Sequence, residues 1–221
     1  MARIAIIGGH GKVALRLSRL LTERGHQVTS LFRKPEQSDD VRKTGATPVV
    51  LDVEESSTEE LARRIEGHEA LVWSAGAGGG NPARTYAVDR DAAIRSMDAA
   101  GRAGVDRYVM VSYVGASLQH GVPEDDPFFA YAEAKAAADD YLRKTGLDWT
   151  ILGPGRLTLE EPSGRIAVGA EMEEAGRDTA RDNVALVAAA VLAEPRTIGT
   201  TIDFVDGEIP IEKAILRAAE T

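Results

Sequence analysis

The sequence predicts an α/β fold, a doubly wound parallel sheet within a single domain. Short apolar runs alternate with amphipathic, helix-like segments over residues 1–152. The apolar runs are continuous, as in strands that are covered on both faces by helices. Alternation of strands with helices favours right-handed crossovers into one parallel sheet. A glycine-rich stretch follows the first apolar run directly, where such a fold turns from strand to helix.

The elements can be placed by their periodicity. The predicted strands span residues 3–7, 27–32, 47–51, 70–74, 107–112 and 149–152. The predicted helices between them span residues 11–24, 57–66, 84–103 and 128–145. A glycine follows each helix where a left-handed cap is expected to end it; these glycines are Gly25, Gly67, Gly104 and Gly146.

The pattern changes after residue 152, where a polar stretch that begins with Gly153-Pro154-Gly155 runs to residue 181. We expect a helix over residues 182–193, with Thr179 and Asp182 spaced like a capping box at its start. A strand over residues 200–205 and a helix over residues 211–219 complete the chain.

The same pattern predicts how the domain is divided. Because no linker is long enough to separate a second domain, residues 1–221 are expected to form one. Residues 1–152 would form the cofactor-binding core. Residues 153–221 would be a small substrate-side extension that supplies one wall of a cleft, with the last strand and helix.

Composition excludes several classes of function. The net charge of −9 makes nucleic acid a poor partner, and no apolar run approaches the roughly 20 residues of a membrane span. The apolar run after Met1 is too short for a signal peptide, so we expect a cytoplasmic protein. A monomer is expected because no apolar edge is obvious, with a dimer as the alternative.

Metal and thiol chemistry are not expected. The chain has no cysteine, which excludes disulfides, thiolate nucleophiles and cysteine-based metal sites. The four histidines show no ligand spacing with one another or with carboxylates; they are His10, His26, His68 and His120.

The glycine-rich stretch IIGGHGKVA, residues 6–14, indicates a phosphate-binding turn. Gly8 would turn tightly out of the strand, Gly11 would let a phosphate approach the helix N-terminus, and Ala14 would allow close packing. A purely structural turn is the alternative, but the motif follows the first strand of a βαβ unit, as the Rossmann fingerprint requires. The candidate contacts of the pyrophosphate are Gly8, Gly9, His10, Gly11, Lys12 and Val13.

The end of the second strand indicates which dinucleotide binds. An acidic residue there favours NAD, whereas an arginine can accommodate the 2′-phosphate of NADP. The sequence reads SLFRKP over residues 30–35, with no carboxylate and with Arg33 and Lys34 adjacent. We therefore expect NADP, with NADPH preferred over NADH; the alternative is that both cations are solvated loop charges.

Taken together, several stretches resemble the atypical short-chain dehydrogenase/reductases, in particular their small NmrA-like, NAD(P)H-binding group. Their order and spacing carry the resemblance, which covers nearly the whole chain. The stretches are IIGGHGKVA (6–14), SLFRKP (30–35), LDV (51–53), VWSAG (72–76), YVMVS (108–112), YAEAK (131–135), LDWTILGPG (147–155) and, more weakly, RDNVA (181–185).

The resemblance implies further cofactor contacts. Asp52 and Val53 would lie at the adenine, although an N-cap or a solvent-exposed carboxylate stays open for Asp52. Ser74, Ala75 and Gly76 would line the ribose and the pyrophosphate. The residues implied near the nicotinamide are Pro154, Gly155, Arg156 and Leu157.

The resemblance also implies a catalytic group. In the wider superfamily, a lysine that binds the nicotinamide ribose lowers the pKa of a tyrosine, and this tyrosine exchanges a proton with the substrate. Tyr131 and Lys135 match this pair and share one helix face. Ser112 matches the third member, a hydroxyl past the fifth strand.

The chain departs from the family pattern at two places. Tyr113 follows Ser112 where this group commonly has a second serine, so either hydroxyl could orient a carbonyl, or Ser112 could serve only backbone groups. Gly153 stands where relatives often carry arginine, and Arg156 is the candidate to replace it.

These observations predict an NADP(H)-dependent oxidoreductase of the atypical short-chain type. Its expected partner is a small-molecule substrate, namely a small carbonyl, quinone or flavin-like acceptor. The alternatives are a non-catalytic NADP-binding redox sensor and, less favoured, an NAD-dependent epimerase.

Overall fold

A computed structural model describes residues 1–78 and 80–220. The strands are β1 (Arg3–Ile7), β2 (Gln27–Phe32), β3 (Thr47–Val50), β4 (Ala70–Trp73), β5 (Arg107–Val111), β6 (Asp148–Pro154), β7 (Arg156–Thr158), β8 (Arg165–Val168), β9 (Asp178–Ala180), β10 (Thr200–Asp206) and β11 (Ile209–Pro210). The α-helices are α1 (Lys12–Glu23), α2 (Ser38–Arg42), α3 (Thr58–Ile65), α4 (Pro82–Thr85), α5 (Ala93–Ala103), α6 (Phe129–Arg143), α7 (Arg181–Ala193) and α8 (Ile211–Ala219). A π-helical segment, η2 (Tyr86–Ala92), joins α4 to α5, and short 3-10 turns are η1 (Pro35–Gln37), η3 (Gly169–Glu173) and η4 (Pro195–Thr197).

The central sheet has the strand order β11-β8-β10-β6-β5-β4-β1-β2-β3. The strands from β10 to β3 in this order run parallel, and β8 and β11 add antiparallel pairs at one edge. The order β3-β2-β1-β4-β5-β6 is that of the doubly wound dinucleotide-binding folds. The predicted Rossmann-type fold is therefore confirmed.

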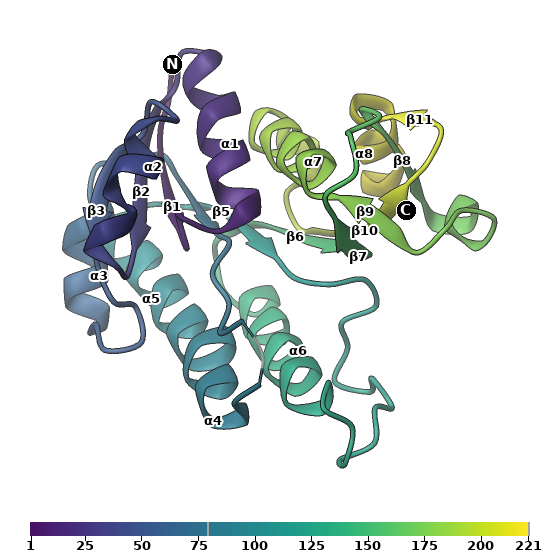
Figure 1. Ribbon diagram of the computed structural model, residues 1–221, viewed down its shortest axis with the longest axis horizontal. Coiled ribbons are helices and arrows are strands. Elements are labelled where there is room, and N and C mark those ends of the chain that lie inside the picture. Colours follow the sequence, from purple (N-terminus) through teal and green to yellow (C-terminus); the bar gives the residue numbers. More distant parts are fainter. Residues whose placement is uncertain (79, 221) are drawn as a thin grey trace.

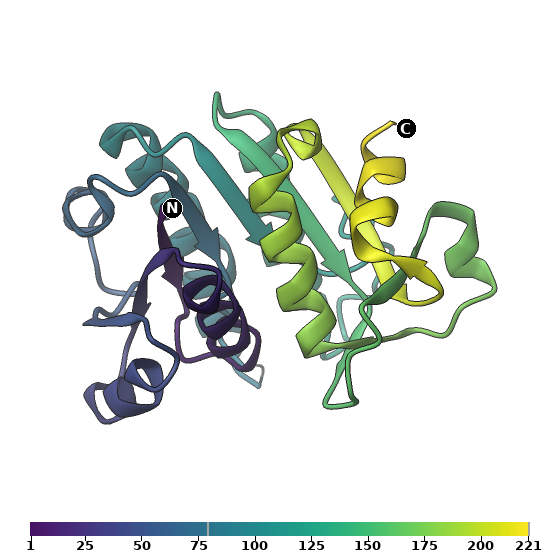
Figure 2. The ribbon, with the colours of Figure 1, turned by 90° about the horizontal axis from the view of Figure 1, so that it is seen from above.

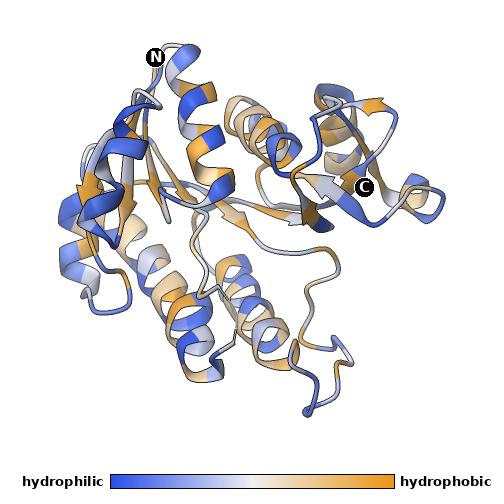
Figure 3. Ribbon diagram, viewed as in Figure 1, coloured by the Kyte–Doolittle hydropathy of each residue, from blue (hydrophilic) through white to orange (hydrophobic). Residues whose placement is uncertain are grey.

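Helices cover both faces of this sheet (Figure 1). Successive residues of each strand point to opposite faces, so the continuous apolar run of β1 supplies Ile4 and Ile6 to one core and Ala5 and Ile7 to the other. In Figure 3 the strands are mostly apolar, whereas the outer sides of the helices carry most of the polar residues.

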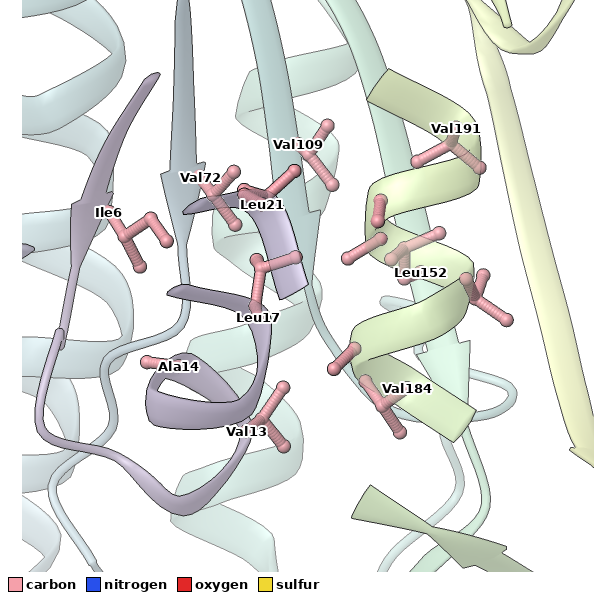
Figure 4. Close-up of a cluster of buried hydrophobic side chains, with 14 of the residues drawn as sticks. Ile6, Val13, Ala14, Leu17, Leu21, Val72, Val109, Leu152, Val184 and Val191 are labelled. Atoms are coloured by element: carbon pink, nitrogen blue, oxygen red, sulfur yellow. The ribbon is translucent and has the colours of Figure 1, made fainter. Parts of the chain in front are cut away.

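The first core lies beneath α1 and α7, which lie side by side when the molecule is seen from above (Figure 2). Figure 4 shows Leu17 of α1 and Val184 of α7 among the apolar side chains of this core, which also includes Leu152 of β6. Arg16 of α1 also pairs with Asp182 of α7. These contacts fix α1, whose N-terminus opens at the site described below.

The main differences from the sequence prediction lie in short elements. The polar stretch after residue 152 contains β7, β8 and β9, and α2 forms within a polar segment after β2. Strands of three or four residues and a five-residue helix are too short to show a clear period, so periodicity could not predict them.

Two predicted helix boundaries are wrong, and the first is the glycine cap at the end of α6. Gly146 is not in the left-handed region, unlike Gly25, Gly67 and Gly104. At the end of α6 the hydroxyl of Thr145 donates to the carbonyl of Leu142 instead.

Thr179 does not form the predicted capping box. The N-cap of α7 is Ala180, whose backbone N–H donates to Asp206 of β10 at 2.8 Å. The hydroxyl of Thr179 instead points into the core, where it accepts a hydrogen bond from the Gly155 amide at 3.0 Å.

The C-terminal third mainly extends the sheet. β10 pairs with β6 and β8 pairs with β10, while β7 and β9 form a separate small pair. Within the described part of the chain, no helix has the length and apolar character needed to cross a bilayer.

Candidate functional site

A cleft of about 290 Å³ opens at the carboxyl ends of β1, β2 and β4. Between β1 and β4 the strand order of the sheet reverses, and open α/β sheets bind their ligands at this point. The predicted cofactor residues that line this cleft are Gly8, His10, Gly11, Arg33, Lys34, Asp52, Val53, Ser74, Ala75 and Gly76.

The glycine loop brings the ends of three strands together. The amides of Gly8 and Gly9 both donate to the carbonyl of Leu31, at 3.0 and 2.8 Å. Gly8 has φ +82°, and a Cβ there would lie 2.5 Å from the Cα of Ala75. A Cβ at Gly9 would lie 2.5 Å from that of Ser30. Glycine is therefore required at both positions for β1 to end against β2 and β4.

The N-terminus of α1 faces the cleft through Gly11, its N-cap residue. Among the described residues no side chain caps this helix, and its first turn carries no acidic residue. Helix N-termini carry a partial positive charge and unpaired N–H groups, which together bind phosphate. The loop and the helix thus have the features of the anion site that the sequence predicts, and phosphate binding there stays a prediction.

The side of the cleft next to β2 is basic. Arg33 and Lys34 follow β2 and are exposed, and no acidic side chain pairs with either in the part of the chain that the structure describes. Arg84 of α4 also lines the cleft and was not predicted, and its guanidinium pairs with the carboxylate of Glu54. This local positive charge contrasts with the net charge of −9 of the whole chain.

Asp52 is the acidic residue of the cleft lining. Its Oδ1 accepts a hydrogen bond from the amide of Glu54 at 3.0 Å. The N-cap interpretation of Asp52 is wrong, because Ser57 caps α3 by accepting from Glu60. Asp52 therefore shapes the loop after β3 while it faces the cleft.

Two arginines that the sequence analysis missed hold this loop. Arg95 of α5 donates to the carbonyls of Val53 and Glu54 at 2.9 and 3.0 Å. Arg84 links the carboxylate of Glu54 at 3.1 Å to the carbonyl of Ala77 at 2.5 Å. No local signal in the sequence could have identified these two arginines. Their bonds to Val53 and Glu54 join residues far apart in the chain, and both side chains come from ordinary polar helix faces.

The predicted catalytic side chains form a second group, at the end of β5 and on α6. Lys135 is 1% exposed, and its Nζ donates to the carbonyl of Val111 at 2.8 Å and to the Sδ of Met110 at 3.2 Å. Ser112 is also buried, and its hydroxyl donates to Asp139. The structure brings these residues together, but not into the lining of the cleft.

Two buried carboxylates flank Lys135. Burial raises the pKa of Asp139 and that of Asp89 on η2, and the cation of Lys135 opposes both shifts. Burial lowers the pKa of Lys135, while Asp139 and Asp89 oppose that shift. Asp89 also accepts a hydrogen bond from the amide of Ala77 at 3.0 Å, which connects this group to the cleft.

The pKa of Tyr131 differs from what the family resemblance implies. Burial raises the pKa of this phenol, and Asp89, Asp139 and Tyr113 add to the shift. The expected lowering by Lys135 is wrong for this structure, because burial of the phenol raises its pKa and the carboxylates of Asp89 and Asp139 raise it further. The spacing of Asp139, four residues after Lys135 and eight after Tyr131, was visible in the sequence as one helix face.

The remaining predicted contacts lie outside the cleft lining. A Cβ at Gly155 would lie 2.4 Å from the carbonyl of Arg177, so Gly155 serves packing. Arg156 is exposed and pairs with Asp178 at 2.7 Å. Pro154, Leu157, Lys12 and Val13 do not reach the lining either, and Val13 is buried in the core. A nicotinamide contact by residues 154–157 stays a prediction.

A dinucleotide fits the residues of this cleft. The glycine backbone and the helix N-terminus would hold the pyrophosphate, and Asp52 and Val53 would lie at the adenine. The volume of the cleft, about 290 Å³, is near the lower end of the range for small-molecule sites, which begins at roughly 300 Å³. The cleft can therefore hold only part of a dinucleotide. Across residues 1–78 and 80–220, no three potential ligand side chains are grouped to hold a metal.

Known proteins are similar to this chain in sequence and in fold. The sequence model of the NAD(P)H-binding family matches residues 8–195. A Bacillus subtilis protein named "Uncharacterized sugar epimerase YhfK" is 32% identical over 97% of this chain and 99% of its own. The structure of a putative NAD-dependent epimerase/dehydratase from Bacillus halodurans superposes with a TM-score of 0.89 at 32% identity, covering 98% of this chain and all of that one. The oxidoreductase ylbE from Lactococcus lactis gives 0.86 at 29%, covering 99% and 97%.

The raised pKa of Tyr131 can be tested by following tyrosinate absorbance during an alkaline titration. The folded state holds the proton of Tyr131 more tightly than the unfolded chain does, where the tyrosine pKa is about 10. The stability that this phenol contributes is therefore lost as the pH rises above about 10.

We expect Tyr131→Phe to leave the absorbance of the native protein unchanged up to a pH of about 10. Tyr141→Phe, on the exposed end of α6, is the control for removal of one phenol. A step near neutral pH that disappears in Tyr131→Phe would mean that Lys135 lowers the pKa after all.

Proposed function

The chain belongs to the NAD(P)H-binding family, and on this basis we propose that it is an NADP(H)-dependent oxidoreductase of the atypical short-chain type. Its acceptor would be a small carbonyl, a quinone or a flavin-like molecule. The proposal includes hydrogen-bonded binding of the dinucleotide along the glycine loop, with adenine at Asp52 and Val53.

The preference for NADP rests on one observation. Arg33 and Lys34 line the cleft directly after β2 without an acidic neighbour there. A 2′-phosphate needs cations at this position, whereas the 2′-hydroxyl of NAD is usually held by a carboxylate. The arrangement therefore supports NADPH over NADH.

Tyr131 is the proposed proton donor for this reduction. When bound, the reduced nicotinamide supplies two electrons and one hydrogen to the carbonyl carbon of the acceptor. The Tyr131 phenol is protonated at neutral pH, since even an unperturbed tyrosine has a pKa of about 10 and burial raises the pKa of this one further; the protonated phenol is the form that can give a proton to the carbonyl oxygen. The alcohol and the oxidised dinucleotide then leave, and a proton from solvent restores the Tyr131 phenol.

A non-catalytic redox sensor is the second candidate. The observation that favours it is that Tyr131, Lys135 and Ser112 do not line the cleft. Such a protein would bind NADPH without consuming it. Two relatives carry the word epimerase in their names, and these names support an NAD-dependent epimerase as a third candidate. In such an enzyme the cofactor would stay bound through purification.

The cofactor preference can be tested by titrating NADPH and NADH against the wild type and Arg33→Ala, following nicotinamide fluorescence. Loss of charge-assisted contacts of about 1.5–3 kcal/mol should weaken NADPH binding roughly 10- to 100-fold. NADH binding should change less than about twofold. Arg42→Ala is the control, because Arg42 is an exposed arginine of α2 paired with Asp39. Equal affinity of the wild type for both cofactors would contradict the assignment.

Turnover separates the reductase from the sensor. We expect the wild type to consume NADPH, measured by absorbance, with menadione as the acceptor. Tyr131→Phe should lower kcat/KM by about 100-fold or more, the usual contribution of a general acid, and Tyr141→Phe should not. NADPH that binds but is never consumed across carbonyl, quinone and flavin acceptors would support the sensor instead.

A further inference from the structure

We propose that Tyr113, and not Ser112, offers the hydroxyl that orients the substrate carbonyl, and that Asp139 withdraws Ser112 from that role. The inference rests on the proposed reductase function. It also narrows the acceptor to a planar, conjugated carbonyl compound of the quinone type.

The hydroxyl of Ser112 is already engaged. A serine hydroxyl has a single proton to donate, and Ser112 gives it to Oδ2 of Asp139 at 2.5 Å. The side chain is 5% exposed, and the backbone amide of Ser112 donates to the carbonyl of Leu152 at 2.7 Å. Ser112 can therefore accept a hydrogen bond, but it has no proton left for a carbonyl oxygen.

Asp139 cannot easily release this bond. The residue is fully buried on α6, and its Oδ1 has no hydrogen-bond partner among the described residues. Removing the Ser112 bond would leave both carboxylate oxygens without a hydrogen bond, and a buried unpaired acceptor is costly. Asp139 thus acts as a positioning residue that holds Ser112 in one orientation.

The phenol of Tyr113 is free. Its hydroxyl oxygen is buried and has no hydrogen-bond partner in the part of the chain that the structure describes. Buried hydroxyls are nearly always paired, so an unpaired one next to Tyr131 points to a partner that a ligand supplies. Burial and the carboxylates of Asp139 and Asp203 raise the pKa of Tyr113, which keeps its proton available.

Tyr113 also lies beside the proposed proton donor. Its ring centroid is 5.6 Å from that of Tyr131, with the planes tilted by 43°. Phe128 completes the group, with centroids 5.3 Å from each tyrosine, and it is 43% exposed. One phenol can thus hold a carbonyl oxygen by a hydrogen bond while the neighbouring phenol gives up its proton.

The three rings indicate the class of acceptor. Aromatic side chains favour offset or edge contacts with flat conjugated molecules, and Phe128 is the partly exposed member of the three rings, so it is accessible to such a molecule. A quinone presents both a flat ring and a carbonyl oxygen. We therefore expect this group to select conjugated carbonyls over small aliphatic ones.

The test compares Tyr113→Phe, Ser112→Ala and the control Tyr141→Phe, all as full-length chains. Calorimetry measures the binding of menadione to the NADP⁺-saturated protein, and NADPH absorbance measures its reduction. The chain has no cysteine that menadione could alkylate.

We expect Tyr113→Phe to weaken menadione binding about tenfold, since one hydrogen bond is lost, and to lower kcat/KM by at least that factor. Affinity for NADP⁺ should not change, and Ser112→Ala should lose less than Tyr113→Phe in both measurements.

The outcomes separate this inference from the proposed function. Equal menadione binding by the wild type and Tyr113→Phe, or a greater loss in Ser112→Ala, would overturn the assignment of Tyr113. Failure of the wild type to bind menadione would overturn the class of acceptor. Binding that depends on Tyr113 without any NADPH consumption would support the assignment and refute the reductase function.

Discussion

The close approach of the Gly8 backbone to the backbone of Ala75 is the constraint on which the rest of the site depends. A Cβ at Gly8 would lie 2.5 Å from the Cα of Ala75 and 2.7 Å from the carbonyl carbon of Ser74. Because no side chain stands there, β1 and β4 end together, and the chain turns into α1 above them. The N-terminus of α1 then opens on the cleft, with Arg33 on one side and Asp52 beyond it.

A second constraint is the buried charge group on α6. Lys135 donates to the carbonyl of Val111 at the end of β5 and interacts electrostatically with the carboxylates of Asp89 and Asp139. Asp89 holds the amide of Ala77 in the loop after β4, and Asp139 holds Ser112 after β5. The lysine and its two acids therefore organise the loops on the side of the cleft where the chemistry is proposed. This structural role accounts for the burial of all three side chains.

Sequence reasoning predicted the parts of the molecule that leave a local signal. The apolar runs and the glycine spacing identified the sheet, and the adjacent cations Arg33 and Lys34 were visible because they directly follow a strand. It did not predict Arg84 and Arg95, which hold the loop after β3 through bonds to the distant carboxylate of Glu54 and the distant carbonyl of Val53. It also expected Lys135 to lower the pKa of Tyr131, because pair spacing shows which groups share a helix face but not which acids are buried around them.

The central claim is that the glycine loop and the N-terminus of α1 bind the pyrophosphate of a nicotinamide dinucleotide. The most direct measurement is an amide chemical-shift titration of the isotopically labelled protein with NADP⁺. The account predicts saturable shifts at the amides of Gly8, Gly11 and Ser74, with none at Gly104 and Thr145, far from the cleft. Saturable shifts confined to other parts of the molecule, with the glycine loop unchanged, would contradict it.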